Sequence, residues 1–219
     1  MKKIIYILAI IGAFTFSSCE SEVSFLELAG QQGFVFNGTT QDIQTYIGQE
    51  AYDKFKVDLR MPINTGDNPP VLNGNFVLNE AAIYDEILDE YTFNQSYIEF
   101  YLANQNNEEL TLNYMAYFWH YGIDGVFDTT DDEMTAEEES IPGEPVYISG
   151  DAAGNFTIIL KTQVAPGRVD VVAVSGKRVV NGIEDLEYAY VKYDNGDPDT
   201  GNIEFGVRII DGDFFSEPF

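Results

Sequence analysis

From residue 73 onward the chain alternates between apolar and polar residues in short runs, a pattern typical of β-strands. Turn-forming residues such as Ala165-Pro166-Gly167 and Asn181-Gly182 separate several of these runs. The runs are residues 74–78, 97–103, 110–121, 145–149, 155–162, 169–175, 187–193 and 203–210. About eight strands, mostly in hairpin order, predict an all-β fold. A single antiparallel β-barrel and a two-sheet β-sandwich both fit this pattern.

Two other segments have the spacing of short helices. Residues 39–56 carry an apolar side chain at every fourth position, after threonines that suit a helix N-cap, although Gly48 interrupts the run. Those apolar positions are Ile43, Ile47, Ala51 and Phe55. Residues 79–91 place Ile83, Tyr84, Ile87, Leu88 and Tyr91 at helical spacing. The chain is therefore expected to have a short helical N-terminal segment and a further helix after the first strand.

The N-terminus has the layout of a secretory signal. The basic start Met1-Lys2-Lys3 precedes an apolar run, Ile4–Phe16, that is too short to span a bilayer comfortably. Two serines then lead to Cys19, the only cysteine of the chain. An ordinary signal peptide cut near an incidental cysteine is one interpretation. A lipoprotein signal, which leaves an acylated Cys19 at the new N-terminus, is the interpretation that we favour.

This interpretation divides the chain into a signal, a tether and one domain. Residues 1–18 are the expected signal peptide, and residues 19–35 are the lipidated Cys19 with its tether. Residues 36–219 are expected to form a single β domain. Within this domain, residues 36–72 form a lead-in of helix and loop, and residues 73–219 form the barrel or sandwich.

Several motifs resemble those of Bacteroidota lipoproteins. Phe16-Ser17-Ser18-Cys19 resembles the bacterial lipobox in its loose form, and Glu20-Ser21-Glu22 resembles the export signals that direct such lipoproteins to the cell surface. Blocks through the mature chain resemble a group of uncharacterised lipoproteins of this phylum. They are Met61-Pro62-Ile63, Asn68-Pro69-Pro70, Ile148-Ser149-Gly150 with Asn155-Phe156-Thr157, and the Ser175-Gly176 block that continues through Gly182 to residues 183–189.

These resemblances imply a lipid anchor and an address in the cell envelope. The protein would lie at the outer membrane, on its periplasmic face or at the cell surface. The acidic segment 122–144 is longer and more acidic than in that group, so a shared role for it does not carry over. Gly74-Asn75-Phe76 is similar to the Gly-x-Trp opening of lipocalins, with Phe in place of Trp, which gives the barrel a lipocalin-like character.

The charge of the chain is strongly negative, at −26, and loss of Lys2 and Lys3 with the signal would make it −28. Between Arg60 and Lys161 there is no Lys or Arg, yet this window carries 19 Asp and Glu. Nucleic acid is therefore not an expected partner, because its phosphates would be repelled. Divalent cations are natural partners of such a surface.

The most acidic loop predicts a calcium site. Calcium binds six to eight oxygens from flexible loops. The candidate ligands are Asp124, Asp128, Asp131, Asp132 and Glu133, with Gly125 allowing a sharp bend. The alternative is a solvated, partly disordered excursion that extends to Glu137-Glu138-Glu139. A second acidic segment, residues 194–199, is expected to be a hairpin turn.

The run 110–121 predicts a strand with an apolar face and an aromatic face. The core face holds Leu110, Leu112, Tyr114, Ala116 and Phe118. The other face holds Asn113, Met115, Tyr117, Trp119 and Tyr121. Aromatic rings beside hydrogen-bonding groups suit the stacking of sugars or other small ligands. We therefore take Asn113, Tyr117, Trp119 and Tyr121 as candidate ligand-binding residues, with packing of both faces as the alternative.

Catalytic motifs are scarce, and we do not expect an enzyme. His120 is the only histidine, Cys19 is consumed by acylation, and no Gly-x-Ser-x-Gly elbow occurs. The leading hypothesis is a lipid-anchored envelope protein that binds a small ligand such as a carbohydrate. One alternative is a structural or adhesive surface component with a calcium-stabilised loop. Another is a glycosidase that uses paired carboxylates.

Overall fold

The structure is a computed structural model that describes residues 37–85, 90–123, 125–127, 129–216 and 218–219. The predicted signal peptide, Cys19 and most of the tether lie outside the described residues. Asp124 and Asp128 of the acidic loop lie outside them too. The predictions made for these residues are therefore not addressed by the structure.

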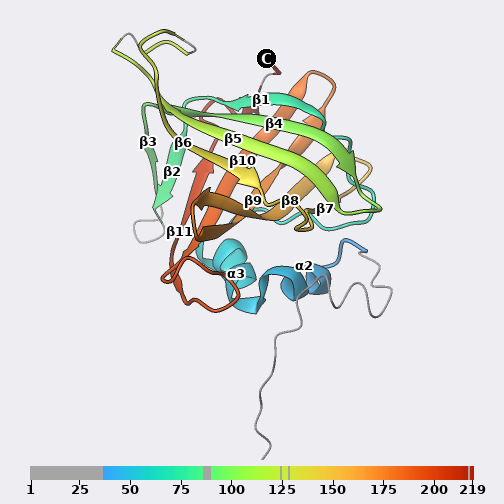
Figure 1. Cartoon of the computed structure of the whole chain (residues 1–219). Helices are drawn as coiled ribbons and strands as arrows, with labels where there is room; N and C mark the ends of the chain where they lie inside the picture. Colours follow the sequence, from blue (N-terminus) through green and yellow to red (C-terminus); the bar gives the residue numbers. More distant parts are fainter. Residues whose placement is uncertain (1–36, 86–89, 124, 128, 217) are drawn as a thin grey trace, which may run out of the picture.

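The described chain begins with short helices and continues almost entirely as strands (Figure 1). The helices are α2 (Thr40–Ile47), α3 (Gln49–Asp53) and the π-helix η1 (Lys54–Asp58). The strands are β1 (Gly74–Leu78), β2 (Ala82–Asp85), β3 (Glu90–Phe93), β4 (Ser96–Asn106), β5 (Thr111–His120), β6 (Glu133–Ser140), β7 (Tyr147–Gly150), β8 (Asn155–Ala165), β9 (Arg168–Val179), β10 (Gly182–Tyr193), β11 (Ile203–Ile210) and β12 (Phe215–Ser216). The predicted all-β class is confirmed.

All the strands named above belong to one sheet, and the pairings between them are antiparallel. Its order is β1-β4-β5-β6-β8-β9-β10-β11-β2-β3, with β7 added to β8 and β12 added to β10. The end strands β1 and β3 do not pair with each other, so the sheet curves around a core without closing into a ring. An open barrel or a sandwich describes this architecture. The expected hairpin turn at residues 194–199 is confirmed, since it lies between the paired strands β10 and β11.

The helix predicted over residues 39–56 is confirmed, although it is divided into three short segments. Thr39 caps α2 through a reciprocal pair of hydrogen bonds with Asp42, which satisfies backbone donors at the helix start. Gly48 ends α2 at a φ of 82°, a conformation that a residue with a side chain rarely adopts. Gly48, which interrupts the apolar run in the sequence, is thus the residue at which the helix breaks.

Two predictions about local structure were wrong. Residues 82–85 and 90–93 are strands β2 and β3, not part of a helix, because β2 pairs with β11 and β3 with β2. The acidic residues 133–140 form strand β6, not a solvated excursion, because backbone bonds to β5 hold them in the sheet. Glu137 and Glu139 are exposed on the outer face of this strand, whereas Glu138 points inward and is buried. The sequence did not predict this strand, because its buried inward residue, Glu138, is a carboxylate and adds no apolar position to the pattern.

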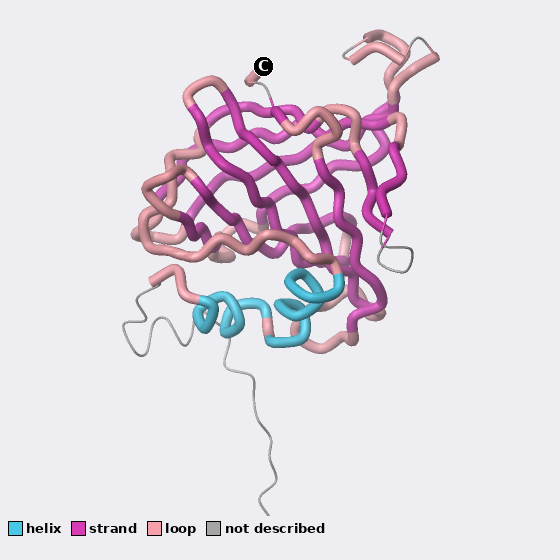
Figure 2. The backbone as a smooth tube through the Cα atoms, turned by 180° about the vertical axis from the view of Figure 1, so that it is seen from behind, coloured by secondary structure: helices cyan, strands magenta, loops and turns pink. Residues whose placement is uncertain are grey.

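The strands β8, β9 and β10 are apolar on both faces. Their inner residues, such as Ile158, Val172 and Tyr188, join the main core with residues of β1, β4 and β5. Their outer residues, such as Ile159 and Ala173, pack against the helical segment. The helices lie along one side of the strand body in two opposite views (Figures 1 and 2). The central strands are therefore covered on both sides, which explains their nearly continuous apolar sequence.

Candidate functional site

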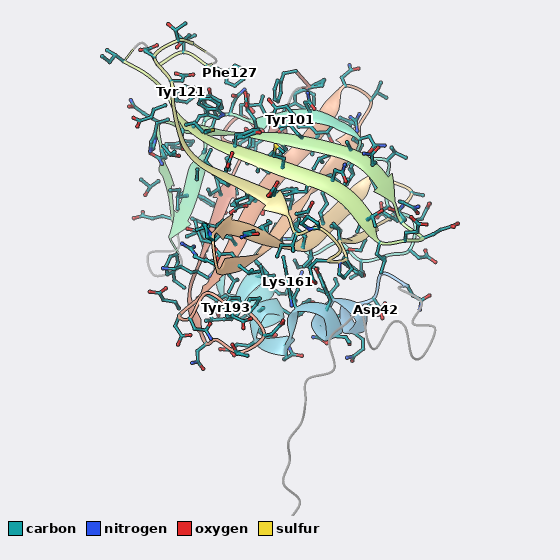
Figure 3. The ribbon with its side chains drawn as sticks, in the orientation of Figure 1. Asp42, Tyr101, Tyr121, Phe127, Lys161 and Tyr193 are labelled. Atoms are coloured by element: carbon teal, nitrogen blue, oxygen red, sulfur yellow. The ribbon has the colours of Figure 1, made fainter. Side chains whose placement is uncertain are left out.

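The predicted aromatic face lies on the outer side of the sheet. Leu112, Tyr114 and Ala116 of β5 are buried in the main core, so the predicted core face is confirmed. On the other face, Trp119 stacks on Tyr97 of β4, with ring centroids 6.0 Å apart and planes 8° apart. Tyr97 also contacts Tyr121 and Phe127, which lie at the base of the acidic loop (Figure 3).

The polar atoms of this aromatic face are bound to the protein itself. Trp119 Nε1 donates a hydrogen bond to Glu99 Oε2 at 3.2 Å, and Tyr101 Oη donates to the same oxygen at 3.3 Å. Tyr101 and Tyr117 contact each other edge to face. Asn113 is exposed near the start of β5, where it pairs with Ala103. The face thus assembles Tyr117, Trp119 and Tyr121, and its role as a ligand site stays a prediction.

The acidic loop uses two of its predicted calcium ligands to organise its own backbone. Asp132 accepts hydrogen bonds from the N–H groups of Gly122 and Thr129 and from Tyr97 Oη. Asp131 accepts from Ile123 N–H and from the Thr129 hydroxyl. Desolvation acts to raise the pKa of Asp132, but these hydrogen bonds lower it below its ordinary value.

The predicted calcium site is only partly within the described residues. Glu133 is exposed and begins strand β6 opposite His120, beside Asp131 and Asp132 in sequence. Among the residues that the structure describes, no group of three or more acidic, histidine or cysteine side chains is arranged to hold a metal ion. With Asp124 and Asp128 outside those residues, calcium binding stays a prediction. The negative charge of Asp131 and Asp132 is met by hydrogen-bond donors of the same loop and of β4.

A pocket of about 500 Å³, here called the β3–β11 pocket, lies between β3, β10, β11 and the turn that follows β11. Its aromatic residues are Tyr91, Phe93 and Phe214, which are 40%, 68% and 60% exposed. Its charged residues include Asp185, Glu187, Arg208 and Asp211. Exposed rings beside convergent polar groups are the usual composition of a small-molecule site.

Two strained residues shape one wall of this pocket. Strand β10 bulges between Glu184 and Glu187, and Asp185 within the bulge has a φ of 50°. Its N–H donates to the carbonyl of Phe214, which itself has a φ of 63°. Left-handed conformations are uncommon for residues other than glycine and tend to cluster at functional sites. The hydrogen bond between these two residues holds the backbone of Phe214 beside the β10 bulge.

Arg208 and Glu187 form a buried ion pair on the floor of the pocket. Arg208 Nε and Nη2 donate to the two carboxylate oxygens of Glu187, each at 2.8 Å, and Nη1 donates to the carbonyl of Leu59 at 3.1 Å. The guanidinium also lies 5.6 Å from the ring centroid of Tyr84 and 5.8 Å from that of Tyr91. Burial raises the pKa of Glu187, while the bonds from Arg208 act against that rise.

Asp211 is the pocket residue with the most perturbed acidity. It is 1% exposed, and burial raises its pKa to about 7, with the nearby Asp213 charge adding to the rise. Ser216 Oγ donates to Oδ2 at 2.6 Å, while Oδ1 is buried without a hydrogen-bond partner. Carboxyls with raised pKa values in clefts are candidates for functional roles.

Comparison with protein-family models, curated proteins and solved structures found no match. No described helix is both long and apolar enough to cross a membrane.

The β3–β11 pocket was not predicted from the sequence. Its residues come from β3, the β10 bulge, β11 and the turn after it, which only the strand order brings together. The segment Asp211-Gly212-Asp213-Phe214 does carry a signal, because it places an aromatic residue in an acidic turn outside the alternating apolar runs. None of the predicted ligand-binding residues lines this pocket.

Proposed function

We propose that this protein is a lipid-anchored envelope protein that binds a small ligand, a carbohydrate, in the β3–β11 pocket. The observation that carries this proposal is the set of exposed rings of Tyr91, Phe93 and Phe214 in one pocket with the exposed carboxyl of Asp185. Sugars present C–H faces that stack on aromatic rings and hydroxyls that bind carboxylate and guanidinium groups. Within about 500 Å³ the pocket offers exposed rings and the carboxyl of Asp185, above the buried pair of Arg208 and Glu187.

The anchor follows from the N-terminal sequence. Acylation of Cys19 with two or more chains would hold the mature chain at a membrane, since each buried methylene contributes about 0.8 kcal/mol. With an acidic tether and an envelope address, the pocket would lie outside the membrane, where it would meet nutrients or glycans. The strongly acidic body is repelled by anionic lipid surfaces, so it would stand away from the bilayer.

A carboxylate-based glycosidase is the second candidate, and one observation favours it. Asp185 and Asp211 line the same pocket, and the raised pKa of Asp211, at about 7, would leave part of it protonated near neutral pH. Glycosidases use two carboxyl groups in one site, and the one that acts as general acid has a raised pKa. Turnover of a bound sugar, lost in Asp211→Asn, would identify this activity.

The test is a glycan array followed by titration calorimetry of the sugars that bind. Phe93→Ala and Phe214→Asn should weaken binding by about tenfold or more, because each removes a stacking ring. Asparagine is chosen at 214 because it tolerates a left-handed backbone. Phe205→Ala, on β11 outside the pocket, is the matched control and should bind normally.

Two results would contradict a carbohydrate site in the β3–β11 pocket. If Tyr117→Ala abolished binding and the two pocket variants did not, the aromatic face of β5 would be the binding surface. If no glycan bound the wild-type protein at millimolar concentration, the carbohydrate proposal would fail.

A further inference from the structure

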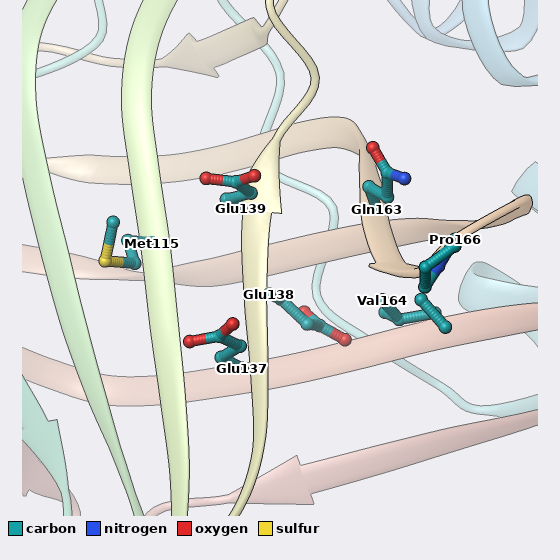
Figure 4. Close-up of a pocket in the computed structure, with 8 residues that line it drawn as sticks. Met115, Glu137, Glu138, Glu139, Gln163, Val164 and Pro166 are labelled. Atoms are coloured by element: carbon teal, nitrogen blue, oxygen red, sulfur yellow. The ribbon is translucent and has the colours of Figure 1, made fainter.

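A second cavity opens where strands β6 and β8 stop pairing. The two strands pair only at Glu139 with Gln163 and at Ser140 with Thr162. Beyond these pairs lies a cavity of about 290 Å³, here called the β6–β8 gap. It is lined by residues 137–139 of β6, residues 163–166 of the β8–β9 hairpin, and Met115 of β5 (Figure 4). It shares no lining residue with the β3–β11 pocket.

Glu138 is the buried acid of this gap. Its side chain points away from those of Glu137 and Glu139, toward the end of β8 (Figure 4). It is only 6% exposed. Tyr188 Oη donates to its Oε1 at 2.8 Å, whereas its Oε2 is buried without a hydrogen-bond partner. An unpartnered buried carboxylate oxygen is costly, so such an atom calls for a ligand or an ordered water.

Two hydroxyls on the strands that flank β6 are unpartnered as well. Tyr114 Oη and Thr162 Oγ1 are buried and have no hydrogen-bond partner. Tyr114 and Thr162 both neighbour Ser140, since Tyr114 N–H donates to Ser140 Oγ and Thr162 pairs with Ser140 across the sheet. Three unpartnered oxygens therefore lie on the adjacent strands β5, β6 and β8, and of these three residues Glu138 lines the gap.

The charges around the gap favour a cation. Its lining includes Glu137, Glu138 and Glu139 and no Lys or Arg. Arg168, whose charge acts on Glu138, already forms a two-pronged ion pair with Asp170. Burial raises the pKa of Glu138 to about 7, with Asp170 adding to the rise and the bond from Tyr188 acting against it.

We propose that the β6–β8 gap binds a small organic cation, whose ammonium group donates hydrogen bonds to Glu138 Oε2 and to the hydroxyls of Tyr114 and Thr162. An ammonium has three donors and no acceptor, which matches three oxygen acceptors. A metal ion fits less well, because the described residues contain no group of three or more metal-binding side chains. The apolar part of the cation would lie against Met115, Val164 and Pro166. This inference does not depend on the proposed function of the β3–β11 pocket.

Binding of the cation would release a proton near neutral pH. Glu138 is partly protonated there, and an adjacent ammonium favours its ionised form. The other titratable or charged groups around it are Tyr114, Glu137, Glu139, Arg168, Asp170, Tyr188 and Tyr190. The buried tyrosines stay neutral at this pH because burial raises their pKa values.

The test is titration calorimetry of the full mature chain with methylammonium, butylammonium and 1,4-diaminobutane. Saturable binding is expected at pH 7, with a heat that depends on the ionisation enthalpy of the buffer because a proton is released. Glu138→Gln keeps an acceptor for Tyr188 and removes the charge, so affinity should fall by about tenfold or more. Glu137→Gln, an exposed neighbour on the same strand, is the matched control and should stay within about twofold of wild type.

A second variant distinguishes a loss of binding from a loss of folding. Thr162→Val removes one acceptor without a change in charge, and it should weaken binding while thermal unfolding still shows a single transition. Absence of saturable binding to wild type at about 10 mM amine would overturn the proposal. So would unchanged affinity in Glu138→Gln, or a crystal structure soaked with butylammonium that shows only ordered water beside Glu138.

Discussion

Trp119 Nε1 donates a hydrogen bond to Glu99 Oε2 at 3.2 Å, from β5 to the neighbouring strand β4. Both side chains are on the outer face of the sheet, yet Glu99 is only 8% exposed. The stacked rings of Trp119 and Tyr97 lie beside this carboxylate and restrict its access to water. The only tryptophan of the chain therefore has a structural role, whether or not a ligand also contacts it.

Replacement of Trp119 by Phe should lower the free energy of unfolding by about 2 kcal/mol, since a hydrogen bond to a buried charged group is lost. Urea unfolding measures this change. The control is Tyr117→Phe, because the Tyr117 hydroxyl holds no neighbouring residue in place through a hydrogen bond. This variant should have nearly the same free energy of unfolding as wild type. Equal stability of Trp119→Phe and wild type would mean that water replaces the indole at Glu99.

The fold was largely predictable because most strands bury at least one apolar face. The run 74–78 coincides with β1, and 203–210 coincides with β11. Prediction failed where a strand lacks an apolar face, as in β6, whose pairing with β5 comes from the backbone. It also failed at residues 82–85, where Ile83 and Tyr84 are adjacent and suit either a helix or a strand paired on both edges.

The functional residues were harder to predict, for a different reason. The β3–β11 pocket depends on β2 and β3 pairing beside β11, a long-range arrangement that local periodicity does not encode. Glu138 looked like one of three solvated glutamates, and only its register opposite Ala116 turns it inward. The acidic loop was identified from composition, but its internal hydrogen bonds to Asp131 and Asp132 were not foreseen.

Breaking the buried ion pair of the β3–β11 pocket should be strongly destabilising. Arg208→Met leaves Glu187 as an uncompensated buried charge, and we expect a loss of about 3–5 kcal/mol. Lys192→Met is the matched control, since its partner Glu204 is 46% exposed, and it should cost less than about 1 kcal/mol. Chemical denaturation of both variants measures the difference. A similar small loss in the two proteins would show that Glu187 gains a proton or another partner.

Asp132→Asn should loosen the acidic loop without unfolding the sheet. The carboxylate holds Gly122, Thr129 and Tyr97 through hydrogen bonds, and the amide is a weaker acceptor. Hydrogen exchange at residues 122 and 129 should therefore become faster. Because the pKa of Asp132 is lowered on folding, its stabilisation is present above its ordinary pKa of 3.8 and is lost as pH falls.

The same hydrogen-exchange experiment tests whether the acidic loop binds calcium. If residues 124–133 bind calcium, adding the ion should slow exchange in wild type and raise its melting temperature by mass action, and Asp131→Asn should reduce both effects. If millimolar calcium has no effect, hydrogen bonds alone stabilise the negative charges of the loop.

The anchor prediction concerns Cys19, the only thiol of the chain. Cys19→Ser should release the protein from the membrane fraction or block its processing, because serine cannot form the thioether-linked lipid. Fractionation with detection of the processed form measures this. Retention of correctly processed mutant protein in the membrane fraction would contradict lipid anchoring at this residue.

The buried acids Glu138 and Asp211 should make the protein less stable as pH rises toward neutrality. Burial raises the pKa of Glu138 from 4.5 to about 7 on folding, so between these values the folded state binds the proton more tightly than the unfolded chain. The stabilisation is fully present below the lower value and is lost as pH rises through the upper one. Asp211, with a pKa raised from 3.8 to about 7, acts in the same direction.

Glu138→Gln removes this proton linkage for one site, and the variant should therefore be the more stable protein at pH 8 and close to wild type at pH 4. The gain at pH 8 is expected to be on the order of 3 kcal/mol, at about 1.4 kcal/mol for each pKa unit. Unfolding free energies at both pH values measure it, with Glu137→Gln as a control whose exposed side chain should give the wild-type profile. A Glu138→Gln profile parallel to that of wild type would mean that folding leaves the pKa of Glu138 unchanged.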